Sequence, residues 1–127
     1  MLAHNLSDDF IKAYQSWHTN TYPQQSSDLS DLVTHGQKPQ AMIISCCDSR
    51  VQAESLFNAK AGTFFMHRNI ANFIPHASQG DMATPTAAAL EYAIKALNVP
   101  HIIIMGHSQC GGVKGCLLYT SPSPRDA

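Results

Sequence analysis

Three short runs of apolar residues recur along the chain, and polar residues follow each of them. The runs are Ala41 to Ser45, Thr63 to Met66 and His101 to Met105. Runs that are short, apolar throughout and close to turn signals are typical of strands in a parallel sheet buried on both faces. We therefore expect three buried strands.

A clear helical pattern separates the second run from the third. Thr84 is a possible cap, Pro85 suits the first helical position, and Asn98 and Pro100 end the pattern. Its apolar stripe is Leu90, Ala93, Ile94 and Leu97, with Glu91 and Lys95 spaced to pair away from that stripe. A strand, a crossover helix and a strand form a βαβ unit, which predicts an α/β fold: a βαβ-based, mostly parallel sheet flanked by helices.

The first 40 residues predict a helical arm. An apolar stripe at helical spacing follows the possible cap Ser7, and we assign it to packing, in the chain or against a partner subunit. A polar stretch from His18 to Ser27 precedes a second, shorter helix near Asp28 to His35. The stripe consists of Phe10, Tyr14 and Trp17.

Composition narrows the class of partner and the compartment. With a net charge of -1, the chain has no electrostatic reason to bind nucleic acid or an anionic membrane, so a small-molecule substrate is expected. The longest apolar run, Ile102 to Met105, is too short to cross a bilayer, and no secretion signal is recognisable. We therefore expect a cytoplasmic protein whose 4 cysteines are thiols or metal ligands rather than a disulfide framework.

Polar residues gather where the three expected strands end. In open α/β sheets, ligands bind beyond the carboxyl ends of the strands, so these residues predict the position of a site. The segments are Cys46-Cys47-Asp48-Ser49-Arg50, Arg68-Asn69 and His107-Ser108-Gln109-Cys110.

Within these segments, His107 and Cys110 have the spacing of a metal-ligand pair in a tight turn. Cys46 becomes a third ligand only if its strand end lies beside theirs. Three nitrogen or sulfur ligands leave the fourth position of zinc open, as in catalytic sites, although Cys47 or Cys116 could close it. Adjacent residues of a strand point to opposite faces, so we expect Cys47 to be buried instead.

Asp48 and Arg50 point the same way as Cys46 if the segment is extended. They could form an ordinary ion pair that contributes little to stability. Near a metal, however, a guanidinium keeps a carboxylate ionised and oriented, ready to accept a proton or hydrogen bond, or to occupy the open position.

The set Cys46-x-Asp48-Ser49-Arg50, His67-Arg68-Asn69-Ile70-Ala71-Asn72 and Gly106-His107-Ser108-x-Cys110-Gly111-Gly112 resembles the ordered signature of β-class carbonic anhydrases. This resemblance implies Zn²⁺ on Cys46, His107 and Cys110, and Asp48 and Arg50 as a catalytic orienting pair. It also implies a lyase that hydrates carbon dioxide reversibly to bicarbonate and a proton, with zinc-bound hydroxide as nucleophile.

Further residues of these segments surround the expected metal site. We expect Ser49, Gly111 and Gly112 to bind substrate, although the two glycines could equally serve helix packing, and we expect Arg68 and Asn69 to order the surroundings of the site. Some family members carry a bicarbonate pocket with a Trp three residues before the first Cys ligand. Ile43 stands at that place, so we do not expect this regulated form.

The chain departs from the family near its end. Residues 118–127 are rich in Ser and Pro and resemble translated read-through sequence, so we expect a non-native tail after an incomplete zinc-binding core, residues 41–117. The C-terminal part of the fold would then be missing. Full-length family members are homodimers or higher oligomers.

Two other functions remain open. The first is a non-catalytic zinc-binding fragment or module, which a fourth protein ligand would favour. The second is a redox or sulfur-transfer protein that uses Cys46 and Cys47, for which thiol reactivity unchanged by zinc would be the mark.

Overall fold

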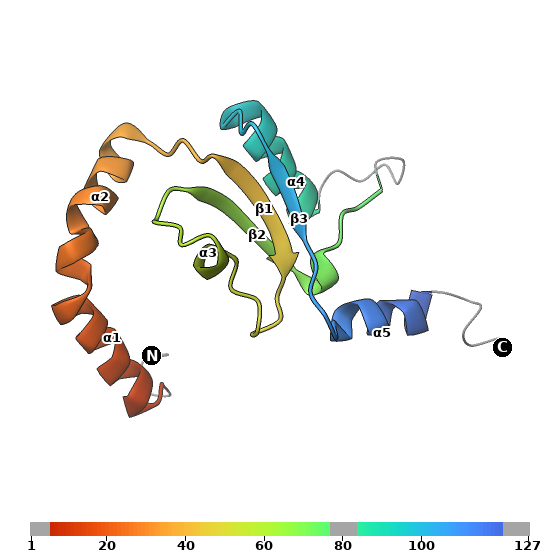
Figure 1. Ribbon diagram of the computed structural model, residues 1–127, viewed down its shortest axis with the longest axis horizontal. Helices are drawn as coiled ribbons and strands as arrows, with labels where there is room; N and C mark the ends of the chain where they lie inside the picture. The colour runs from red at the N-terminus through yellow and green to blue at the C-terminus, as the bar shows by residue number, and fades with distance from the viewer. Residues whose placement is uncertain (1–5, 77–83, 121–127) are drawn as a thin grey trace. The chain divides into compact units, whose positions relative to one another are not determined.

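The computed structural model describes residues 6–76 and 84–120, with side chains as far as residue 115. The chain divides into two compact units, Met1–Gln37 and Lys38–Ala127 (Figure 1). The predicted boundaries at residues 40 and 117 remain predictions, and the expected tail lies largely outside the described residues.

The first unit consists of two helices, α1 (Asp8–Asn20) and α2 (Tyr22–His35). The expected polar interruption between them is wrong, because residues 18–27 are helical except at Thr21. Pro23 lies in the first turn of α2, where its missing N–H costs nothing, and Gly36 ends the helix with φ of 81°. Phe10 and Tyr14 of the aromatic stripe are 66% and 62% exposed, so the described chain does not provide the packing expected for them.

The second unit is built on a three-stranded parallel sheet in the order β2-β1-β3 (Figure 1). The strands are β1 (Ala41–Cys46), β2 (Phe64–Asn69) and β3 (Ile102–Met105), which confirms the three predicted runs. Every residue of the central strand β1 is buried. For β3 the predicted burial on both faces is wrong: among the described strands it pairs only with β1, and Ile102 and Ile104 are 43% and 54% exposed.

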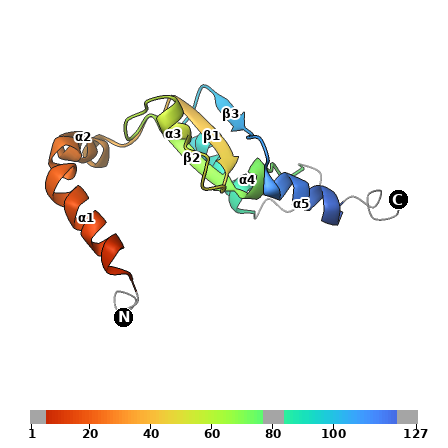
Figure 2. The same ribbon diagram turned by 60° about the horizontal axis from the view of Figure 1, so that its bottom comes forward.

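Helices lie on both faces of this sheet. On one face, α4 (Pro85–Glu91) and the π-helical segment η4 (Tyr92–Ala96) pack on the strands, and α3 (Ala53–Leu56) lies on the other (Figures 1 and 2). The core under α4 comprises Met42, Ile44 and Ala93, with Phe65, Ala89, Leu90 and Val99 packed against it.

The crossover helix begins as predicted and ends differently. The side chain of Thr84 caps α4 by accepting a hydrogen bond from the Ala87 amide at 3.1 Å. After Glu91 the helix widens to a π-helix, which rotates the predicted stripe, so Ile94 is 51% exposed rather than packed. None of the described helices is both long and apolar enough to span a membrane.

The register of the sheet brings the polar segments together. Cys46 at the end of β1 is paired with Asn69 at the end of β2, and Ser45 with Met105 at the end of β3. The short 3₁₀ turn η2 (Ile70–Asn72) follows β2, and α5 (Gly111–Thr120) follows β3. All three segments therefore meet at the carboxyl edge of the sheet.

Candidate metal centre

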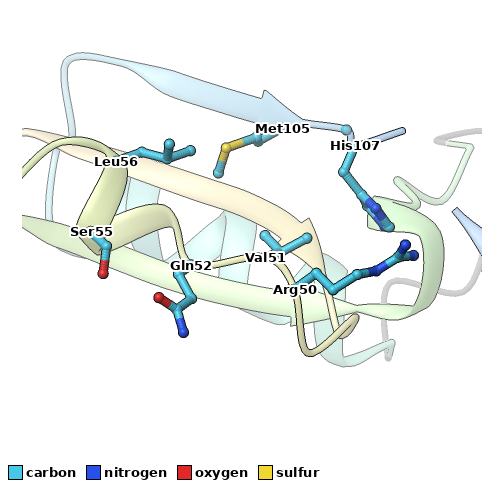
Figure 3. Close-up of a pocket in the computed structure, with 8 residues that line it drawn as sticks. Arg50, Val51, Gln52, Ser55, Leu56, Met105 and His107 are labelled. Atoms are coloured by element: carbon cyan, nitrogen blue, oxygen red, sulfur yellow. The ribbon is translucent and has the colours of Figure 1, made fainter. Parts of the chain in front are cut away.

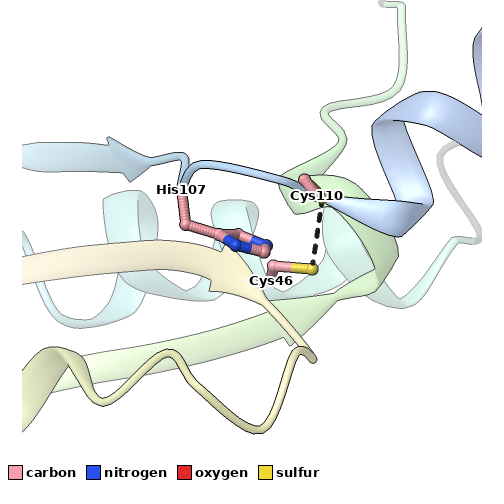
Figure 4. A group of neighbouring side chains, drawn as sticks. All are labelled: Cys46, His107 and Cys110. Atoms are coloured by element: carbon pink, nitrogen blue, oxygen red, sulfur yellow. Dashed lines mark hydrogen bonds between the residues drawn. The ribbon is translucent and has the colours of Figure 1, made fainter.

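Cys46, His107 and Cys110 converge at this edge (Figure 4). One ligand atom from each lies within 4.8 Å of the others, and the Sγ atoms of Cys46 and Cys110 are 3.8 Å apart across 64 residues of sequence. Cys46 could join the other two ligands only if its strand end lay beside theirs, and it does, because β1 and β3 are adjacent strands. Gln109 makes the tight turn between His107 and Cys110 possible with a φ of 53°.

The imidazole of His107 is oriented for metal binding. Its Nδ1 lies 3.0 Å from the carbonyl oxygen of Ser108, and because a carbonyl only accepts, Nδ1 must carry the proton. Nε2 then holds a lone pair. This atom is buried and, in the described part of the chain, has no hydrogen-bond partner. A buried lone pair beside two thiols fits zinc, for which nitrogen and sulfur ligands are usual.

Each sulfur also accepts a backbone N–H. The Ala71 amide donates to Cys46 Sγ at 3.3 Å, and the Val113 amide donates to Cys110 Sγ at 3.5 Å. Burial raises the pKa of the Cys46 thiol, but hydrogen bonds, including those from the Asp48 and Ala71 amides, outweigh it and lower this pKa to about 7. Cys46 is therefore prepared to act as a thiolate.

The Asp48–Arg50 pair forms in a turn, so the extended geometry expected for it is wrong. The Val51 amide donates to the Asp48 carbonyl at 3.0 Å, which closes the turn. Asp48 Oδ1 accepts from the amide and Nε of Arg50, both at 2.9 Å, and Oδ2 accepts from Nη2 at 2.8 Å. The short turn thus produces a bidentate pair from residues only two apart.

This pair adjoins the ligand group. Asp48 Oδ2 lies 3.9 Å from His107 Nε2, and the guanidinium of Arg50 also donates to the Gln109 carbonyl at 3.1 Å. Hydrogen bonds from Arg50 hold the pKa of the Asp48 carboxyl well below its usual range. The carboxylate is ionised at any physiological pH.

Two further predicted residues hold the backbone around the ligands. Arg68 donates from Nε to the Cys46 carbonyl at 2.8 Å and from Nη2 to the Asp48 carbonyl at 2.7 Å. Asn69 bridges the turn that follows it, through Nδ2 to the Phe73 carbonyl and from the Phe73 amide to Oδ1, both at 2.7 Å. The hydrogen bonds that these two side chains make with described residues go to backbone atoms and to Thr86, not to the ligand atoms.

Sequence reasoning missed Ala71. Its φ of 62° is left-handed, a conformation that costs a non-glycine residue roughly 1–2 kcal/mol, and it turns the amide toward Cys46 Sγ. The asparagines at 69 and 72 are the signal that could have found this turn, because Asn is frequent in such conformations.

The two glycines of α5 have different surroundings. A Cβ at Gly112 would lie 2.8 Å from Ile70 Cγ1 and 3.0 Å from Ala71 Cβ, whereas one at Gly111 would meet nothing within 4 Å. Packing of α5 on η2 accounts for Gly112, while substrate contacts of Gly111, Gly112 and the exposed Ser49 remain predictions.

Cys47 is exposed, which corrects the expectation that it is buried. The strand ends at Cys46, so the alternation of faces stops there and the next side chain leaves the sheet. Cys47 does not belong to the ligand group, and the side chain of Cys116 lies outside the described residues.

A pocket of about 360 Å³ opens beside the ligand group (Figure 3). Arg50 and His107 lie at one end of it, and the side chains of α3 lie at the other. Its lining is Arg50, Val51, Gln52, Ser55, Leu56, Met105, Gly106 and His107. The mixture of apolar and polar residues suits a small ligand.

A parallel α/β sheet with two cysteines and a histidine at its carboxyl edge defines a protein with a candidate single-metal centre. The family model described as carbonic anhydrase matches residues 41–126, and the chain belongs to this family, in its β class. The match extends into residues 118–126, where we expected a tail, and that expectation remains a prediction.

Individual relatives agree with this assignment. A carbonic anhydrase of Synechococcus elongatus is 36% identical over 107 residues, 84% of this chain. The structure of the β-carbonic anhydrase CcaA superposes with a TM-score of 0.78 at 34% identity, over 89% of this chain and 49% of that one. Tetrameric β-carbonic anhydrases from Sordaria macrospora give a TM-score of 0.60 at 34% identity, over 91% and 53% of the two chains.

The chain spans only part of these relatives. It covers 38% of the length of the Synechococcus protein and about half of each solved structure. The described residues nevertheless contain the ligand group and the Asp48–Arg50 pair. Because the chain matches only part of each relative, a catalytic activity is proposed below rather than assigned from the relatives.

Proposed function

We propose that this chain carries the catalytic zinc site of a carbonic anhydrase, which converts carbon dioxide and water reversibly to bicarbonate and a proton. The observation that carries the proposal is the group of Cys46, His107 and Cys110, whose ligand atoms lie within 4.8 Å of one another beside an ionised carboxylate. Family membership supports the same reaction.

These three residues would hold the zinc ion through two sulfurs and Nε2 of His107. Zinc bound in this way supplies one kind of chemistry, the activation of a water molecule as a nucleophile near neutral pH. The protein contributes the ligand geometry: Ser108 fixes the tautomer of His107, and the Ala71 and Val113 amides support the sulfurs.

Asp48 would orient the reacting water. Its Oδ1 accepts from two donors of Arg50, whereas Oδ2 accepts from one donor among the described residues and lies 3.9 Å from His107 Nε2. The remaining lone pair of Oδ2 is therefore available to accept a hydrogen bond beside the ligand group. Arg50 holds the carboxylate in that orientation from the opposite side.

The same carboxylate is unsuited to storing a proton. A general base is most effective when its pKa is near the working pH, and Arg50 keeps the pKa of Asp48 far below that range. The proton released by the reaction would therefore pass to solvent or buffer. The pocket beside Arg50 and His107 provides a route for small molecules.

We also propose a homo-oligomer, a homodimer or larger, for the full-length protein and a cytoplasmic location. The tetramers of the Sordaria relatives support the first, together with the exposed edge strand β3 and the exposed aromatic residues of α1. The exposed free thiol of Cys47, which lies outside the ligand group, supports the second, because reducing compartments maintain such thiols.

A non-catalytic zinc-binding fragment is the second candidate. The observation that favours it is coverage: the chain spans 38% of the length of the Synechococcus relative. Such a fragment would bind zinc with the same three ligands and leave carbon dioxide unchanged.

Stopped-flow carbon dioxide hydration on the zinc-loaded chain distinguishes these candidates. We expect a rate above that of buffer, which Cys110→Ser loses together with zinc and which Cys47→Ser retains, because Cys47 lies outside the ligand group. Zinc content measured on the same samples separates binding from catalysis. One zinc per chain with no hydration would favour the non-catalytic fragment, and equal rates for the parent and Cys110→Ser would contradict catalysis at this site.

A further inference from the structure

The turn after β2 presents a backbone amide to one metal ligand. In this turn, the Ala71 N–H points to Cys46 Sγ at 3.3 Å, from a residue whose φ is 62° and whose side chain is buried. A left-handed conformation at a residue with a side chain persists only where the surrounding structure enforces it. The contacts around residues 69–73 identify what enforces it here.

The side chain of Asn69 closes this turn through two hydrogen bonds to the backbone of Phe73. Its Nδ2 donates to the Phe73 carbonyl and its Oδ1 accepts from the Phe73 amide, each at 2.7 Å, so the side chain spans residues 70–72. The second proton of Nδ2 reaches Thr86 Oγ1 at 3.0 Å. Thr86 is buried at the start of α4 and also contacts His67 Nε2 at 2.9 Å. The side chain thus fixes the turn to the crossover helix.

Two backbone contacts fix the turn to residues that neighbour the ligands in sequence. The Cys47 amide donates to the Asn69 carbonyl at 3.0 Å, which holds the end of β1 beside the start of the turn. From the other side, the backbone of Gly112 approaches Ala71 so closely that a Cβ there would lie 3.0 Å from the Ala71 nitrogen. The amide has little freedom to leave the sulfur.

An N–H donated to a thiolate withdraws electron density from the sulfur, and groups behind a ligand in this way tune the metal. We propose that Asn69 is a positioning residue of the metal centre: by closing the 70–72 turn it holds the Ala71 amide on Cys46 and so lowers the electron density of that ligand. The inference rests on the proposed metal site and is independent of the reaction carried out there.

Cobalt(II) provides the test, because it can replace zinc and its thiolate-to-metal charge-transfer absorption reports the electron density on sulfur. In the 127-residue chain loaded with cobalt, we expect Asn69→Ala to shift this band to longer wavelength, since a thiolate without its N–H donor gives up charge more easily. Ala71→Gly retains the N–H and suits a positive φ, so its band should stay at the parent position.

A second variant tests the amide without disturbing Asn69. Replacing Ala71 by lactic acid exchanges the amide N–H for an ester oxygen and keeps the methyl side chain. We expect the same direction of shift as for Asn69→Ala. A cobalt-loaded ester variant with the parent band would overturn the inference, even if Asn69→Ala failed to fold.

The remaining outcomes separate the inference from the proposed function. If the band shifts in Asn69→Ala and in the ester variant while the zinc-loaded parent chain does not hydrate carbon dioxide, the result would support the inference and contradict catalysis. No charge-transfer band in the parent chain after cobalt loading would overturn the metal site and the inference together.

Discussion

Arg50 joins two segments of the site that are distant in sequence: its guanidinium donates to Asp48 and, at 3.1 Å, to the carbonyl of Gln109. Gln109 belongs to the turn that places His107 and Cys110. The residue that orients the carboxylate is therefore also attached to the segment that carries two of the three candidate ligands. A guanidinium at position 50 has enough donors to make both contacts at once.

We expect Arg50→Lys to lower kcat/KM for carbon dioxide hydration by roughly 10–100-fold, because lysine cannot hold Asp48 in a bidentate pair and reach Gln109 as well. Zinc content should not change, since position 50 supplies no ligand. Stopped-flow kinetics with metal analysis would measure both. Lys95→Gln is the matched control: it removes a cation from an exposed ion pair with Glu91, remote from the ligands, and should leave the rate unchanged.

The carboxyl of Asp48 should titrate below the usual range in the parent chain, and its pKa should rise toward about 3.9 in Arg50→Gln. The sign follows from the pair: Arg50 favours the ionised form, so its removal makes protonation easier. Carboxyl carbon NMR of selectively labelled protein would follow this titration. A midpoint that is the same in both proteins would mean that Arg50 does not hold the carboxylate in solution.

Zinc affinity should weaken as the pH falls below about 7, the pKa of Cys46. Above that pH the sulfur is already ionised, whereas below it the metal must displace a proton, and the apparent dissociation constant should rise about tenfold per pH unit for each proton displaced. Competition with a chromophoric chelator from pH 5 to 8 would measure this dependence. An affinity that is constant through this range would show that Cys46 is not a ligand.

Gly112→Ala should destabilise the chain by about 1–3 kcal/mol, because the added Cβ would overlap Ile70 and Ala71. Gly111→Ala is the matched control, since a Cβ at that position meets nothing within 4 Å. Urea unfolding of the two zinc-loaded variants would compare their stabilities. Equal stability would indicate that α5 does not pack on η2 as closely as described.

The sequence predicted the parts of this molecule that rest on apolar patterning and on side-chain chemistry. Short apolar runs predicted the three strands, and residue type predicted the Thr84 cap. The rule that ligands bind at the carboxyl ends of parallel strands predicted the meeting of Cys46 with His107 and Cys110. The beginning of α2 was missed because Gln24, Gln25, Ser26 and Ser27 carry no apolar stripe from which a helical period could be recognised.

What escaped prediction depends on backbone conformation. The turn at Asp48 is closed by backbone amides, which the sequence pattern does not reveal. The amide of Ala71 reaches Cys46 through a left-handed φ, a conformation that is not expected for alanine from its residue type. The exposure of Cys47 depends on where β1 ends, and element boundaries are poorly defined by pattern alone.

The position of Cys46 on the central strand and of the other two ligands after the edge strand has a consequence for folding. A metal ion bound to all three would tie together sulfurs that are 64 residues apart in sequence, and so close a long loop of chain. Because the ligands are not assembled in an unfolded chain, the free energy of metal binding would become free energy of folding. The ion would then act as a cross-link that keeps β3, which pairs with one strand in the part of the chain that the structure describes, from fraying off the sheet. A chelator would loosen that strand before it unfolds β1.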